Sequence, residues 1–138
     1  MRAGRLRRGL VLAAPVAWML LIFALSSVPG RRPPGAQHWD KLAHFVEYAI
    51  LGWLGHRALR ELGLSSARAA VVAAAGAAAY GISDEWHQSF VRWRSVEAAD
   101  ALADAAGASF AAWMAHRFPG RLESLKDGAE PGRAAPGG

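Results

Sequence analysis

The sequence YGISDEWHQSFVRWRSVEAADALADAAG, residues 80–107, decides the fold of this chain. An alanine-rich segment with almost no charge leads into it from Ala69, and a second apolar segment continues beyond it to Met114. Between the two lie acids, a histidine, an amide and two arginines, in the order Asp84, Glu85, His87, Gln88, Arg92, Arg94, Glu97, Asp100 and Asp104. Polar groups concentrated between two apolar segments indicate a site with a function.

Four apolar segments can be traced outward from this stretch, and they predict helices at about 10–28, 42–59, 67–84 and 96–115. The first contains no charge and can cross a hydrocarbon core of about 30 Å at about 1.5 Å per residue. A cleaved signal peptide begins in the same way, with arginines before an apolar run. The run is long for a signal core and lacks a small-residue cleavage site, which favours a retained helix.

The fold class that follows is an all-α integral membrane protein. Residues 1–118 are expected to form one domain, an antiparallel bundle of four transmembrane helices joined by short links. A compact, soluble, alanine-rich helical protein is the alternative. Residues 119–138 are rich in proline and glycine with mixed charges, and they are expected to form a disordered tail.

The charged residues predict how the bundle lies in the membrane. The chain has 16 Lys and Arg against 11 Asp and Glu within 138 residues. Because the arginines sit at the ends of apolar runs and form no single stripe, we expect the membrane bilayer and not nucleic acid as the partner. Most of them fall on the side of the two termini. The positive-inside rule therefore predicts a multi-pass protein of the cytoplasmic membrane with both termini cytoplasmic.

Helical spacing places polar side chains on one face of each of three predicted helices. The three faces carry Asp40, His44, Glu47 and Tyr48; Tyr80, Asp84, His87 and Gln88; and Glu97, Asp100, Asp104 and Gly107. In an antiparallel bundle these faces meet at one end. An acid at the centre of a membrane helix costs roughly 2.5–3.5 kcal/mol, so such acids should lie near the interface, pair with a cation such as Arg94, or line a wet cavity. We expect one polar pocket on the extracytoplasmic side.

Two motifs on these faces resemble those of the VanZ-like membrane proteins, a family named for a teicoplanin (glycopeptide) resistance protein. The first is His44-Phe45-x-x-Tyr48 after Asp40-Lys41, and the second is Asp84-Glu85-x-His87-Gln88-x-Phe90 followed by Arg94, Asp100 and Gly107. The resemblance covers about residues 10 to 116. It implies a four-helix membrane protein of the cell envelope, with a link to antibiotic resistance, and it names no settled reaction.

The sequence departs from the family pattern at two places. Arg92-Trp93 stands where the family usually has Pro-Gly, so the loop is expected to be less tightly turned. Asp104 stands where the family usually has asparagine, so amide recognition there should become acidic or proton-sharing.

The polar residues divide by side-chain chemistry into two sets of candidate roles. Imidazole and carboxyl groups suited to acid–base chemistry are supplied by His44, His87, Asp84 and Asp100. Groups suited to holding a ligand are supplied by Tyr48, Glu85, Gln88, Arg94 and Asp104. Arg94 is the anion-binding candidate, with an ion pair to Asp100 as the structural alternative. In an enzyme, Asp84, Asp100 and Asp104 would orient the histidine or bind a divalent ion. The metal signal is weak, because Glu85-x-His87 is not a zinc motif such as H-E-x-x-H, so no metal ligand is assigned and the cofactor stays unknown.

Two functions fit these residues equally well from the sequence. One is a binding protein whose polar pocket holds an envelope lipid or an anionic envelope precursor and so alters antibiotic access. The other is a membrane-embedded hydrolase or transferase, acid–base or metal-assisted, acting on a phosphorylated or lipid-linked envelope substrate. A small proton-coupled carrier ranks behind both, because four helices leave little room for two gates.

Overall fold

The computed structural model describes residues 2–30, 37–94 and 96–118. This part of the chain forms four α-helices and no strand: α1 (Arg2–Ser26), α2 (Gln37–Glu61), α3 (Ser66–Gln88) and α4 (Ala98–Arg117). The all-α fold with four helices is therefore confirmed. The predicted tail, 119–138, lies outside the described residues.

The helix boundaries differ from the sequence prediction at the ends. α1 begins eight residues earlier than expected, because the arginine-rich leader continues the helix. α3 continues through the polar stretch to Gln88 and keeps Asp84, His87 and Gln88 on a helix. Asp40 lies within the first turn of α2.

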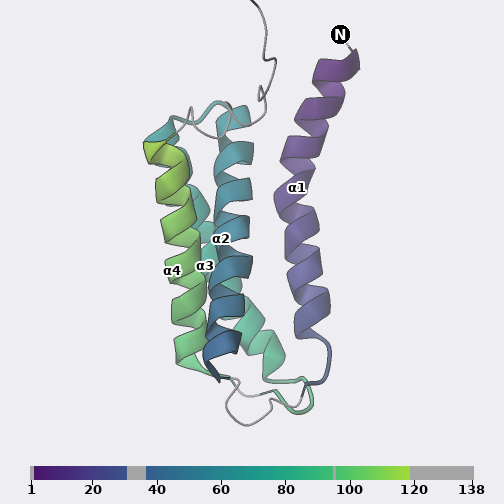
Figure 1. The fold of residues 1–138 in the computed structure, drawn as a ribbon. Helices are drawn as coiled ribbons and strands as arrows, with labels where there is room; N and C mark the ends of the chain where they lie inside the picture. The colour runs from purple at the N-terminus through teal and green to yellow at the C-terminus, as the bar shows by residue number, and fades with distance from the viewer. Residues whose placement is uncertain (1, 31–36, 95, 119–138) are drawn as a thin grey trace, which may run out of the picture.

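The helices alternate in direction along the chain, so α2 and α4 run parallel to each other (Figure 1). α2, α3 and α4 pack together, whereas α1 stands apart at its N-terminal end and approaches the others where it ends (Figure 1). Two of the hydrogen bonds that attach that C-terminal half join it to α2 and to α3. Trp18 Nε1 donates to the Glu47 carbonyl at 2.9 Å, and Tyr80 Oη donates to the Met19 carbonyl at 2.7 Å.

Two glycines set the close approach of α2 to α4. A Cβ added at Gly52 would meet the backbone of Ala108, and a Cβ added at Gly107 would meet the backbone carbonyl of Phe45. No side chain fits between the helices at these points. Small residues of this kind let membrane helices pack backbone against backbone.

Polar side chains are buried in this bundle and many large apolar ones are exposed. The core holds Asp84, Glu85, Gln88, Asp100 and Asp104, while the exposed set includes Val71, Ile82, Leu102, Phe110 and Trp113. Among the described residues, α1 alone is long and apolar enough to span a membrane by length and composition, with a mean hydropathy of 2.2. The other three helices are less apolar because charged and polar residues interrupt their apolar runs.

Candidate functional site

The deepest polar contact joins α2 to α4. His44 Nδ1 and Asp104 Oδ1 lie 2.9 Å apart, and both side chains are buried, Asp104 completely. Gly81 on α3 makes room for the carboxylate, since a Cβ there would lie 2.9 Å from Asp104 Oδ2. The pairing fixes the imidazole ring through one nitrogen and leaves the other, Nε2, without a partner among the residues described. An aspartate that orients a histidine in this way is typical of acid–base and metal sites.

A second contact joins the same two helices nearer their N-terminal ends. Lys41 Nζ donates to Asp100 Oδ1 at 2.9 Å and to Glu97 Oε2 at 2.8 Å. Asp100 is completely buried, so the ammonium group of Lys41 balances a charge that would otherwise be costly. Lys41 precedes the apolar segment of α2, and its hydrogen bonds, first to Glu97 and then to Asp100, raise its pKa. Lys41 was missing from the predicted site, although it lies three residues before His44 on one helical face.

The third contact joins α3 to α1. Asp84 Oδ2 accepts hydrogen bonds from Ser26 Oγ at 2.7 Å and from Gln88 Nε2 at 2.9 Å, and all three residues are buried. The Asp84–Gln88 bond follows from their spacing of four residues on α3. Ser26 was not among the predicted site residues. The sequence feature that could have indicated it is the pair Ser26-Ser27 near the end of an otherwise apolar segment.

His87 does not join His44. Its Nε2 lies 3.0 Å from Ser27 Oγ, and its ring packs on Phe23 with centroids 4.5 Å apart, so it faces α1. The structure therefore places the two predicted histidines in different contacts. His44 lies among the acids of α3 and α4, and His87 lies against the end of α1.

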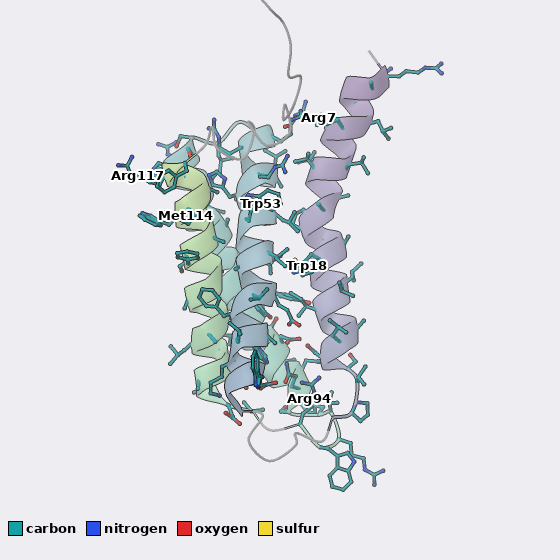
Figure 2. All side chains as sticks on the ribbon, viewed as in Figure 1. Arg7, Trp18, Trp53, Arg94, Met114 and Arg117 are labelled. Carbon is teal, nitrogen blue, oxygen red and sulfur yellow. The ribbon has the colours of Figure 1, made fainter. Side chains whose placement is uncertain are left out.

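Arg94 donates hydrogen bonds to the C-terminal end of α1 and forms no ion pair with Asp100. Its guanidinium donates through Nη2 to the Leu25 carbonyl at 3.0 Å and through Nε to the Val28 carbonyl at 3.4 Å. The predicted alternative of an ion pair to Asp100 is thus wrong, because the arginine satisfies carbonyls at the open C-terminal end of α1. Figure 2 shows Arg94 at the opposite end of the molecule from Arg7 and Arg117.

The loop before Arg94 keeps a tight turn. Arg94 N donates to the Val91 carbonyl at 3.2 Å, and Trp93 adopts a φ of 68°. A positive φ at the third position is typical of a type II turn, where Pro-Gly would be favoured. The expectation of a looser loop is therefore wrong, because tryptophan here adopts the left-handed conformation usually left to glycine.

Glu85 and Tyr48 complete the buried set. Glu85 Oε2 accepts a hydrogen bond from the backbone N–H of Glu97 at 3.1 Å, which ties the end of α3 to the start of α4. Tyr48 is fully buried, and its ring lies 6.2 Å from that of Tyr80. Within the described part of the chain, several buried oxygens have no hydrogen-bond partner: Tyr48 Oη, Asp84 Oδ1, Glu85 Oε1, Gln88 Oε1 and Asp104 Oδ2.

Two groups of side chains are close enough to hold a metal ion. Asp40, His44 and Asp100 form one, and His44, Glu85 and Asp104 form the other, with ligand atoms within 4.8 Å of one another in each group. His44 belongs to both. The sequence motifs indicated neither group, because each one combines residues that are far apart in the sequence and lie on two or three helices.

Comparisons with known proteins bear on this arrangement at the level of the family. The model of the VanZ/LLP1 family matches residues 11–119, which include α2, α3 and α4 completely and α1 from residue 11 onward. No curated protein and no solved structure gave a match. The match covers most of the chain and contains both motifs described above, so the chain belongs to the VanZ/LLP1 family.

Proposed function

We propose that this chain is a multi-pass protein of the cytoplasmic membrane, with four spans and both termini in the cytoplasm. Its buried polar cluster then lies on the extracytoplasmic side, where it binds an envelope lipid or an anionic envelope precursor. Family membership and the apolar α1 helix support the membrane location. The four spans and the ligand are the proposal.

The exposed surface supports spans beyond α1. On α3, Ile82 is 65% exposed, and on α4, Leu102 is 70% exposed and Trp113 is 53% exposed. Large apolar side chains on the outer faces of helices whose inner faces are polar suit a lipid environment, because the bilayer removes the hydrophobic penalty that water would impose.

The observation that carries the ligand proposal is the set of buried acceptors without a partner in the described chain. Tyr48 Oη, Asp84 Oδ1 and Gln88 Oε1 come from two helices, and each such group left unsatisfied costs about 1–3 kcal/mol. The amide oxygen of Gln88 cannot be satisfied by taking up a proton. The hydroxyl and amide groups of a glycosylated or peptidyl headgroup supply the donors that these acceptors need.

The anionic part of such a headgroup fits the rim of the cluster. The interior is rich in carboxylates, which repel phosphate, whereas Arg92 is exposed on the loop before Arg94. A phosphate that meets Arg92 while the polar head reaches inward would satisfy both charge and hydrogen bonding.

Mass spectrometry of lipids that co-purify with the protein in mild detergent tests this proposal. Wild type should retain one lipid class above the membrane background, and Gln88→Met, which removes the amide at similar volume, should lose it. Ser83→Ala is the matched control, because Ser83 lies on the same helix, is exposed, and bonds only to the Tyr80 carbonyl. A lipid profile unchanged in Gln88→Met would refute the proposal.

The link to glycopeptide resistance is tested in cells with the same variants. Expression of wild type should raise the teicoplanin concentration needed to stop growth, and Gln88→Met should abolish that effect. Equal protection by the two would separate resistance from the polar cluster.

A membrane-embedded enzyme is the second candidate, and the His44–Asp104 pair favours it. A carboxylate that holds one ring nitrogen leaves the other positioned as a general base or acid. Incubation of the purified protein with isolated envelope lipids, followed by product analysis, distinguishes the two functions. Product formation that is lost in His44→Gln, with lipid retention unchanged, would establish catalysis. Retention without turnover supports binding alone.

A further inference from the structure

We propose that His44, Glu85 and Asp104 form a site for one divalent transition-metal ion such as Zn²⁺ or Mn²⁺. The inference deepens the proposed function, on which its role at the membrane rests. The three side chains come from α2, α3 and α4, all three are buried, and a ligand atom of each lies within 4.8 Å of those of the other two.

The two carboxylates of this group each have an oxygen that is available to bind a cation. Glu85 uses Oε2 to hold the backbone N–H of Glu97, so its Oε1 is buried without a partner in the described chain. Asp104 uses Oδ1 for His44, and its Oδ2 is equally unpartnered. Each carboxylate therefore keeps one oxygen that a metal can bind while the hydrogen bonds to Glu97 and His44 stay intact.

The charge of the group supports an ion with two positive charges. Two buried carboxylates beside a neutral imidazole carry a net charge of about −2, which is expensive away from water. No lysine or arginine of the described chain forms an ion pair with Glu85 or Asp104. A divalent ion neutralises the group completely, whereas protonation of His44 would leave one negative charge unbalanced.

The spacing and the donor set indicate the class of metal. Two ligands of a tetrahedral ion with bonds of about 2.1 Å lie about 3.4 Å apart. One ligand atom each of His44, Glu85 and Asp104 lies within 4.8 Å of those of the other two, so each pair would close by no more than about 1–2 Å around a bound ion. One imidazole with carboxylates suits Zn²⁺ or Mn²⁺ better than Mg²⁺ or Ca²⁺, which prefer all-oxygen sites. Three protein ligands leave open positions for a headgroup oxygen.

The neighbouring group of Asp40, His44 and Asp100 is the poorer candidate. Lys41 Nζ already lies 2.9 Å from Asp100 Oδ1, so a cationic side chain occupies the position that an ion would need. The deeper group holds no such side chain among the residues described.

Metal titration of the full chain in detergent tests the proposal. The protein is stripped with EDTA and titrated with Zn²⁺ by calorimetry and with Co²⁺ by visible absorption, which reports nitrogen and oxygen ligation. Wild type should bind one equivalent. Glu85→Gln and Asp104→Asn should each weaken binding by at least about 10–100-fold, because even changes next to a ligand have that effect.

Glu97→Gln is the matched control. It makes the same chemical change at the same end of the bundle, but the Glu97 side chain bonds to Lys41 and only its backbone contacts Glu85. Its affinity should equal that of wild type. Circular dichroism and gel filtration establish folding, and Asp104→Asn provides the second variant if Glu85→Gln does not fold.

Two results would overturn the proposal. One is a folded wild type that binds well under one equivalent of either metal. The other is binding that survives both Glu85→Gln and Asp104→Asn, which would place the ion elsewhere. Lipid retention is measured on the same samples. Metal binding without lipid retention would refute the proposed lipid ligand but support the metal site. Lipid retention without metal binding would refute the metal site but support the lipid ligand.

Discussion

Replacing His44 by leucine is expected to destabilise the bundle more than any conservative change at its partner. His44 Nδ1 is the donor to Asp104 Oδ1, and Asp104 Oδ2 has no partner among the described residues. His44→Leu would thus leave a completely buried carboxylate with no hydrogen bond. Removing one member of a buried ion pair costs about 3–5 kcal/mol, and we expect a loss of that size in the free energy of unfolding.

Asp104→Asn should be much milder. The asparagine oxygen can still accept a hydrogen bond from His44 Nδ1–H. The variant therefore loses only the additional strength that the carboxylate charge gives to this hydrogen bond. The difference between a charged and a neutral hydrogen bond is about 1 kcal/mol. The double replacement His44→Leu with Asp104→Leu removes both polar groups, and it should cost less than His44→Leu alone, because apolar replacement of a buried pair is often close to neutral.

Equilibrium unfolding in mixed SDS and mild-detergent micelles measures these differences. The six tryptophans of the chain give a fluorescence signal, and EDTA excludes any contribution from bound metal. The order expected is Asp104→Asn as the smallest loss and His44→Leu as the largest, with the double variant between them. Equal losses for Asp104→Asn and His44→Leu, or a double variant that is no more stable than His44→Leu alone, would refute the reasoning.

Three further predictions use other features of the fold. Gly107→Ala should lower the free energy of unfolding by roughly 1–3 kcal/mol because its Cβ would meet the Phe45 carbonyl, whereas Gly76→Ala, with open space around it, should raise it by up to about 1 kcal/mol; equal effects in the same SDS titration would contradict this. Trp93→Gly should stabilise the turn by about 1 kcal/mol, because it removes a left-handed tryptophan, and a lower melting temperature would argue against that strain. Reporter fusions at residue 62 and at the C-terminus should report the cytoplasm, and a fusion at residue 90 the outside; an external C-terminus would reverse or remove the four-span topology.

The sequence by itself determined the helices and the polar face of each one. Both properties are local, because apolar periodicity and residue spacing along one helix decide which side chains share a face. The bond between Asp84 and Gln88, four residues apart, follows from that spacing once α3 continues to Gln88. The two motifs, on α2 and on the stretch from α3 to α4, likewise identified the family without knowledge of the packing.

The tertiary structure alone decided which polar groups are partners. Arg94 is only six residues from Asp100, yet it binds carbonyls at the end of α1, and Lys41 from α2 takes Asp100 instead. The reason is that partners across helices depend on the rotation and register of each helix. Close backbone contacts such as Gly107 against Phe45 fix that register, and no local pattern in one helix encodes the position of another. The rotation and register of the three helices likewise bring His44, Glu85 and Asp104 together.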